Sequence, residues 1–171
     1  MSETQRLFLG FPATSLATPL GLIQDKLSLS GRRIPPEQLH MTLRFLGNLT
    51  ERQYTSLLSQ LSTMALPRFM LRLEQLGCFP RANVVWIGPT TVPVELTTLY
   101  QELNNRCGSL KLAPPHRAYR PHVTLFRHPC LPELPAITPL IYRPSELCLY
   151  QSTHTEQGPY YRIQSRWPLK D

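Results

Sequence analysis

Two stretches decide the fold of this chain: Leu39–Gly47, LHMTLRFLG, and Arg120–Arg127, RPHVTLFR. Each contains the pattern H-x-T-L, once at residues 40–43 and again, 82 residues later, at residues 122–125. Each copy lies in a short apolar run that is typical of a β-strand. The repeat therefore predicts two related halves that each contribute one such strand.

Strand alternation predicts which way the side chains of both motifs point. An imidazole and a hydroxyl should stand about 6–7 Å apart along each strand, on the face away from the core. In the second copy these are His122 and Thr124, with Val123 and Leu125 toward the core. In the first copy the outer face is predicted to carry His40, Thr42 and Arg44, and the core face Met41, Leu43 and Phe45.

Two imidazoles and two hydroxyls suit phosphodiester chemistry without a metal. One imidazole can deprotonate water while the other, protonated, gives its proton to the departing alkoxide. An unperturbed pKa of about 6.5 allows both roles near neutral pH. The hydroxyls and an arginine would stabilise the charge on the phosphoryl oxygens. A 2′,3′-cyclic phosphate fits so small a set of groups because its strained ring lowers the barrier.

Other active-site patterns are absent from the sequence. The nearest carboxylates to the motifs are Glu37 and Glu133, so no metal site is predicted. No nucleophile elbow, Walker A loop or dinucleotide fingerprint occurs. The four cysteines have no paired C-x-x-C spacing, and we expect them to be unpaired thiols in a reducing compartment: Cys78, Cys107, Cys130 and Cys148.

The flanking sequence predicts a mixed fold of the α+β class with antiparallel sheets. Thr14 or Ser15 should cap a helix that ends near Leu27, and Thr50 with Gln53 fits a capping box. Two further helices are predicted over residues 50–65 and 94–110. Besides the two motif strands, strands are predicted over residues 6–11, 69–73, 83–88, 146–152 and 160–167.

Composition points to one domain over residues 1–171 with an anionic partner. Hydrophobic residues make up 42% and charged residues 17%, as in a soluble globular protein. The net charge is +7, and 15 of the 18 basic residues are arginines, which suit phosphate oxygens. No acid lies between Glu102 and Glu133. A nucleic acid is the functional interpretation of this basic stretch, and a solvated basic face is the alternative.

The two H-x-T-L motifs resemble those of the two-histidine phosphoesterase superfamily. The wider sequence is similar to its bacterial branch, the RNA 2′,3′-cyclic phosphodiesterases, also called 2′–5′ RNA ligases. Besides the two motif stretches, the similar segments are RLFLGF at 6–11, VVWIG at 84–88, LCLYQS at 147–152 and YYRIQSRWPL at 160–169.

The resemblance implies two pseudo-symmetric lobes, each an antiparallel sheet with outer helices, that face each other across an active-site cleft. It implies opening of 2′,3′-cyclic phosphate ends of RNA or nucleotides to 2′-phosphomonoesters, and reversible ATP-independent 2′–5′ RNA ligation. By the family pattern His40 is the proton donor and His122 the proton acceptor. Thr42, Thr124 and Arg127 would bind the phosphate.

Four residues near the motifs carry separate predictions. Arg127 lies five residues after His122, so strict alternation puts it on the opposite face unless the strand ends or bulges. Arg44 shares a face with His40 but has no family counterpart, and we expect it at the surface. Tyr119 and Arg120 are candidate RNA contacts just before the second motif.

The resulting hypothesis is a metal-independent enzyme without cofactors, monomeric and cytoplasmic, with no protein partner and no membrane segment. Its substrates would be RNA ends, tRNA fragments among them, or small cyclic nucleotides. One alternative is an RNA-end-binding module without turnover. Another is a sibling phosphodiesterase that acts on a different cyclic or 2′–5′ linked substrate.

Overall fold

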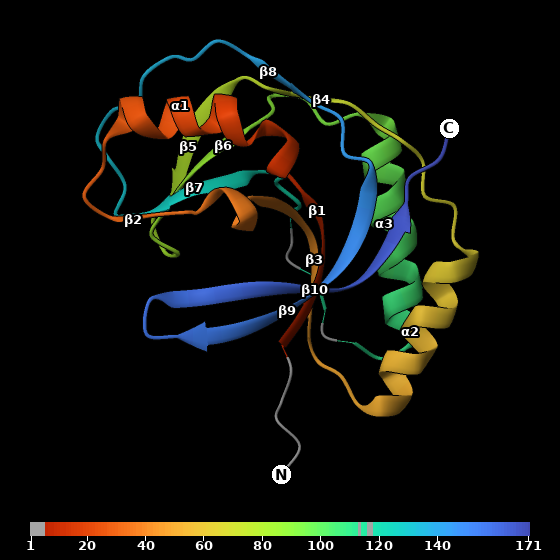
Figure 1. Cartoon of the computed structure of the whole chain (residues 1–171). Coiled ribbons are helices and arrows are strands. Elements are labelled where there is room, and N and C mark those ends of the chain that lie inside the picture. Colours follow the sequence, from red (N-terminus) through yellow and green to blue (C-terminus); the bar gives the residue numbers. More distant parts are fainter. Residues whose placement is uncertain (1–5, 113, 116–117) are drawn as a thin grey trace.

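The structure is a computed structural model that describes residues 6–112, 114–115 and 118–171 (Figure 1). In this part of the chain one sheet of eight strands has the order β10-β9-β1-β3-β7-β6-β5, with β2 also paired to β7, and β4 pairs with β8 in a small second sheet. All pairs between the named strands are antiparallel, so the predicted α+β class is confirmed. The strands are β1 (Arg6–Pro12), β2 (Arg32–Arg33), β3 (His40–Asn48), β4 (Leu71–Leu73), β5 (Gln75–Phe79), β6 (Val84–Gly88), β7 (Val123–Arg127), β8 (Leu140–Tyr142), β9 (Glu146–Thr155) and β10 (Gly158–Pro168).

The helices cover two different parts of this sheet (Figure 1). α1 lies over the part formed by β5, β6 and β7, whereas α2 and α3 lie side by side next to β9 and β10. The two predicted sheets are thus two halves of one sheet, which meet where Met41 of β3 pairs with Val123 of β7. The helices are α1 (Ala17–Leu27), α2 (Glu51–Thr63) and α3 (Val94–Ser109), with short 3-10 helices at Thr14–Leu16 and Pro36–Gln38.

The helices bury the apolar residues that their spacing predicts. Leu57 and Leu61 of α2 are fully buried. The predicted capping box is present as well. The Thr50 hydroxyl accepts from the backbone N–H of Gln53, and the Gln53 side chain accepts from the backbone N–H of Thr50. At α1 the predicted cap is wrong, because the 3-10 turn at Thr14–Leu16 precedes the helix.

Both motif strands bulge at the leucine of H-x-T-L. Along β3, Thr42 pairs with Gly10 and Arg44 with Leu9, so Leu43 is one residue extra against β1. Along β7, Thr124 pairs with Trp86 and Phe126 with Val85, so Leu125 is extra in the same way. A bulge reverses the alternation beyond it. The residue after each leucine therefore turns to the core, and the one after that to the face of the histidines.

The bulge in β3 corrects two predictions. Arg44 is buried, 4% exposed, on the core side; its Nε donates to Asn104 Oδ1 at 2.7 Å and its Nη1 to the Phe45 carbonyl at 2.8 Å. The expected surface position on the side of His40 is therefore wrong. Phe45, predicted to face the core, is 58% exposed instead. A period of two fails here because Leu43 occupies a position without a partner.

The bulge in β7 is fixed by a buried side chain of α1. Gln24 is 1% exposed, and its Nε2 donates to the carbonyl of Leu125 at 2.9 Å and to that of Ile34 at 3.0 Å. The Ile34 backbone N–H also donates to Leu125. These bonds satisfy carbonyls that would otherwise be buried without partners beside the extra residue.

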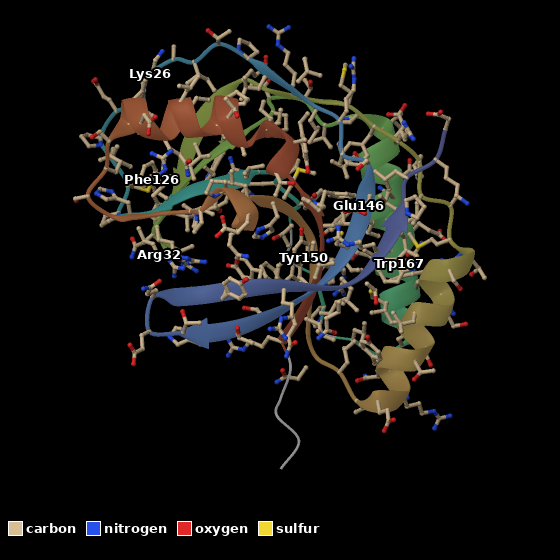
Figure 2. The ribbon with its side chains drawn as sticks, in the orientation of Figure 1. Lys26, Arg32, Phe126, Glu146, Tyr150 and Trp167 are labelled. Atoms are coloured by element: carbon tan, nitrogen blue, oxygen red, sulfur yellow. A yellow bond between two sulfur atoms is a disulfide. The ribbon has the colours of Figure 1, made fainter. Side chains whose placement is uncertain are left out.

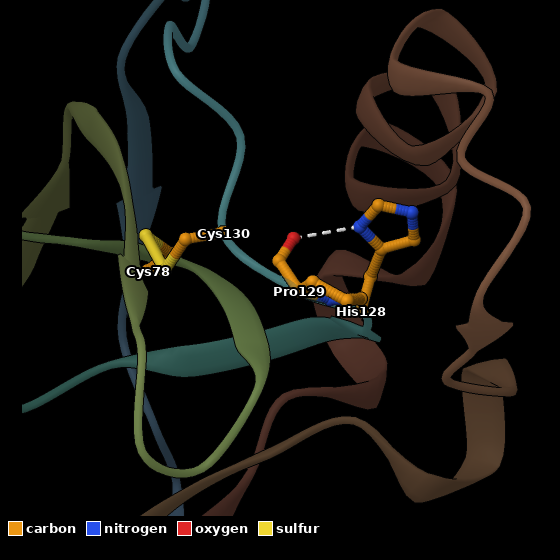
Figure 3. Close-up of a disulfide and its surroundings, with 4 residues drawn as sticks. All are labelled: Cys78, His128, Pro129 and Cys130. Atoms are coloured by element: carbon orange, nitrogen blue, oxygen red, sulfur yellow. Dashed lines mark hydrogen bonds between the residues drawn. A yellow bond between two sulfur atoms is a disulfide. The ribbon is translucent and has the colours of Figure 1, made fainter.

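A disulfide between Cys78 and Cys130 corrects the expectation of unpaired thiols (Figure 3). It joins β5 to the segment after β7, and its Cα atoms are 5.6 Å apart. In that segment His128 Nδ1 donates to the Pro129 carbonyl at 2.7 Å. Cys107 and Cys148 are buried thiols, as expected. A separation of 52 residues made the bonded pair invisible to a spacing argument.

Within the described ranges, no helix is long and apolar enough to cross a membrane.

Removal of the buried guanidinium should destabilise the fold. We expect Arg44→Ala to lower the free energy of unfolding by about 2 kcal/mol, because Asn104 and a carbonyl lose a charged donor. Exposed Arg52 of α2 provides the control, and Arg52→Ala should change it by less than about 0.5 kcal/mol. Urea unfolding followed by circular dichroism measures both; equal stability of the two variants would contradict the buried position of Arg44.

Candidate active site

The two motifs come together on one face of the sheet. Met41 and Val123 oppose each other and point to the core. Continuing this antiparallel register puts His40 opposite Thr124 and Thr42 opposite His122. Directly opposed residues share a face, so all four predicted site residues lie together on the side away from the core.

Both imidazoles are oriented in the same way by the backbone before them. His40 Nδ1 bonds the carbonyl of Gln38 at 2.8 Å, and His122 Nδ1 bonds that of Arg120 at 2.7 Å. A carbonyl oxygen can only accept, so each Nδ1 carries a proton. In the neutral ring this leaves Nε2 with a free lone pair, and in the charged ring Nε2 is a donor. Each histidine can therefore act as base or acid through Nε2.

An aromatic ring stands edge-on to each histidine. Tyr161 of β10 lies 4.7 Å from His40 between ring centroids, at 72°. Phe79 of β5 lies 4.9 Å from His122, at 88°. Additional rings surround the histidines at 5.2 to 6.0 Å: Phe8 and Tyr150 at His40, and Trp86 at His122.

These surroundings favour the neutral form of both histidines. Burial is the main cause that lowers the pKa of His40 from 6.5 to about 4, and the charges of His122 and Arg127 lower it further, against the opposing effect of the Gln38 carbonyl. Burial also lowers the pKa of His122, and the guanidinium of Arg120 adds to this shift. The free site thus lacks the negative charge that would stabilise an imidazolium.

The bulge brings Arg127 to the histidines. Because Leu125 is the extra residue, Arg127 returns to the face of His122 and Thr124. Its Nη2 donates to the Tyr161 hydroxyl at 2.9 Å, and its charge acts on His40. Thr42 and Thr124 are half-buried, and neither hydroxyl hydrogen-bonds another described residue. All three predicted phosphate-binding side chains therefore lie on one face.

The two candidate RNA contacts lie in different environments. Arg120 is exposed, with its guanidinium carbon 5.5 Å from the centroid of Phe79. Tyr119, by contrast, packs against the core: it stacks on Tyr100 at 4.4 Å and donates to the Thr42 carbonyl at 3.0 Å. Burial raises the pKa of Tyr119 well above its ordinary value. These contacts make Tyr119 a support for β3, and its role as an RNA contact stays a prediction.

Sequence reasoning missed the residues that hold the histidines in place. Tyr161 and Phe79 come from strands distant in the sequence, and no local pattern identifies them. Gln38 is also a side-chain clamp: its amide exchanges two hydrogen bonds with the Tyr161 backbone, at 2.9 and 2.7 Å. Within the described ranges, no group of three His, Cys, Asp or Glu residues is placed to hold a metal ion.

Known proteins are similar to this chain over most of its length. The family model of the 2′-5′ RNA ligase superfamily matches residues 12–154. An Aeropyrum pernix protein named RNA 2′,3′-cyclic phosphodiesterase is 30% identical over 159 residues, which cover 84% of this chain and 90% of that protein. The Escherichia coli protein of the same name is 28% identical, with 99% of each chain covered.

Solved structures are similar as well. The crystal structure of Escherichia coli LigT complexed with 3′-AMP has a TM-score of 0.85 at 27% identity, covering 99% of this chain and 100% of that one. The crystal structure of TT0787 of Thermus thermophilus has a TM-score of 0.78 at 25% identity, covering 96% and 97%.

The protonation of the free site can be tested by nuclear magnetic resonance. Ring nitrogen shifts should show both neutral imidazoles with the proton on Nδ1. His40 should titrate near pH 4 and His122 below pH 6.5, because burial disfavours their charged forms. His40→Ala and His122→Ala assign the signals. Midpoints at or above 6.5, or a proton on Nε2 in the neutral rings, would contradict this geometry.

Proposed function

Because the chain belongs to the 2′-5′ RNA ligase superfamily, we propose that it hydrolyses the 2′,3′-cyclic phosphate ends of RNA or nucleotides to 2′-phosphomonoesters by a metal-independent pair of histidines. Relatives that match most of the chain are named RNA 2′,3′-cyclic phosphodiesterases, and the chain is accordingly a phosphodiester hydrolase. The observation that carries the mechanism is the matched pair of imidazoles, each with Nδ1 bound to a carbonyl and Nε2 available.

The reaction needs one neutral and one charged imidazole. His122 Nε2 takes a proton from water as the water oxygen bonds to phosphorus. The bond from phosphorus to the 3′ oxygen breaks, and His40 Nε2 gives its proton to that oxygen. The product retains the phosphate on the 2′ oxygen. Afterwards His122 holds a proton and His40 lacks one, so one proton passes to solvent and one returns before the next turnover.

The phosphate supplies the negative charge that the free site lacks. A phosphodiester anion between Thr42, Thr124 and Arg127 would raise the pKa of both histidines, because it favours the imidazolium form. His40, with a pKa of about 4 in the free protein, is then a proton donor only when substrate is bound. Hydroxyl and guanidinium donors would stabilise the charge that grows on the phosphoryl oxygens.

Ligation would use the same groups in the same roles. A 5′ hydroxyl takes the place of water: His122 removes its proton as its oxygen bonds to the cyclic phosphorus, the bond from phosphorus to the 3′ oxygen breaks, and His40 protonates that oxygen, which leaves a 2′–5′ linkage. The family description includes this activity, so the same site serves both proposals.

That the chain acts as a monomer in the cytoplasm stays a prediction, and a disulfide such as Cys78–Cys130 is rare in cytosolic proteins.

Loss of either imidazole should abolish turnover. His40→Ala and His122→Ala should each lower kcat about a hundredfold to ten-thousandfold on RNA ending in a 2′,3′-cyclic phosphate, because each removes a proton-transfer group. The assay is run in excess EDTA, with the product identified as the 2′- or 3′-phosphate. Exposed His154 of β9 provides the control, and His154→Ala should retain full activity.

Three outcomes would overturn the proposal: an inactive wild type in EDTA, a 3′-phosphate product, or full activity of either histidine variant. RNA binding retained without any turnover would favour the RNA-end-binding alternative. Turnover of only a different cyclic or 2′–5′ linked substrate would favour the sibling phosphodiesterase.

The pH dependence of the reaction rate should show the lowered pKa values of the two histidines. We expect a bell-shaped kcat/KM that peaks on the acid side of pH 6.5, because the lowered pKa values of both histidines leave them neutral above it. The profile of kcat, which reports the substrate complex, should be displaced to higher pH by the bound anion. Steady-state kinetics from pH 4 to 9 measures both. A rate that does not depend on pH, or coincident pH profiles of kcat and kcat/KM, would contradict the proposed effect of the bound phosphate on the pKa values of the histidines.

A further inference from the structure

A second arginine stands beside Arg127. Arg32 of β2 pairs with Arg127 of β7 in the antiparallel register, so both side chains leave the same face of the sheet. Arg127 is in turn bonded to the Tyr161 hydroxyl, and the Tyr161 ring contacts His40. Arg32 is thus the strand neighbour of an arginine that is linked through Tyr161 to the proposed proton donor.

One nitrogen of the Arg32 guanidinium has no acceptor among the described residues. This nitrogen, Nη1, is buried and makes no hydrogen bond there. Figure 2 shows Arg32 extending from β2 toward the β9–β10 hairpin. There it lies against Gly158: a Cβ at this glycine would stand 2.0 Å from Nη1, and φ is +104°. Arg32 as a whole is only half-buried, so part of the residue stays accessible to solvent although Nη1 is covered.

Among the residues that the structure describes, no carboxylate is paired with either of these two charges. Within the described ranges neither Arg32 nor Arg127 makes an ion pair, whereas the adjacent Arg33 is exposed and bonds Asp25. Two guanidiniums on one face, one with a buried donor unsatisfied, are costly without an anion. Guanidinium donors match phosphate oxygens in geometry as well as in charge.

We propose that Arg32, next to Arg127, provides a second anion site that binds the phosphodiester on the 5′ side of the terminal nucleotide. This rests on the proposed function, since it assumes that the cyclic phosphate lies between the histidines. Arg32 would then bind the next phosphate along the RNA, on the 5′ side of the one that reacts. The site would favour oligonucleotide ends over nucleoside 2′,3′-cyclic phosphates.

Two substrates and a matched pair of variants test this site. Adenosine 2′,3′-cyclic phosphate has no second phosphate, whereas the dinucleotide ApA with a 2′,3′-cyclic phosphate end has one. Arg32→Gln should raise KM for the dinucleotide about tenfold, because one charge-assisted contact is lost, and leave KM for the mononucleotide unchanged. Arg33→Gln, which removes an equal charge one residue away, should change neither.

A binding measurement separates this proposal from the proposed function. The affinity of a fluorescent trinucleotide ending in a 2′-phosphate is measured by anisotropy over a series of salt concentrations. Arg32→Gln should weaken it and reduce the slope of log K against log salt by about 0.7, the value for one phosphate contact on a single strand. Arg32→Lys should keep the slope but bind more weakly, because it retains the charge without the planar fork.

The KM and binding results either support or overturn the second anion site. An equal rise of KM for both substrates would place Arg32 on the cyclic phosphate and overturn the second site. Unchanged binding and slope in Arg32→Gln would overturn it too. If the wild type hydrolyses neither substrate but Arg32→Gln changes binding as expected, the proposed function fails and the anion site stands.

Discussion

Two extra residues in the large sheet, Leu43 and Leu125, determine which side chains the site receives. Without the bulge in β7, Arg127 would face the core, where a guanidinium needs buried partners. Without the bulge in β3, Arg44 would leave the interior and lose Asn104. The same irregularity in both motifs therefore has opposite results: it buries Arg44 in one half and brings Arg127 to the face of the histidines in the other.

The site combines features that are unfavourable without a ligand. Burial and nearby positive charge lower the pKa of both imidazoles and keep them neutral, and a buried guanidinium nitrogen has no acceptor among the described residues. Such groups are stabilised together when one anionic chain provides the missing charge. The acid–base chemistry and the anchoring of the substrate then depend on the same electrostatic deficit.

The duplicated motif was enough to predict that its two histidines and two threonines share a face, because a period of two is reliable over three residues of a strand. It failed beyond Leu43, where alternation placed Arg44 and Phe45 on the wrong faces. Those errors come from backbone irregularities stabilised by distant groups, such as Gln24 of α1, which no local pattern reveals. The rings at the histidines and the Cys78–Cys130 bond likewise depend on tertiary proximity. The sequence patterns also failed to predict β2 and β5. β2 has only two residues, and β5 contains a glycine, so neither shows a local strand pattern.

The pair Met41–Val123 has a mechanical consequence. Each histidine is adjacent in sequence to a member of this pair, about 3.4 Å along its strand. If the two halves of the sheet twist about the pair by about 10°, a Cα one residue away moves by only about 0.6 Å. The pair is thus a pivot with very short lever arms: a twisting motion of the halves would open the periphery of the molecule while the separation of the two histidines hardly changed.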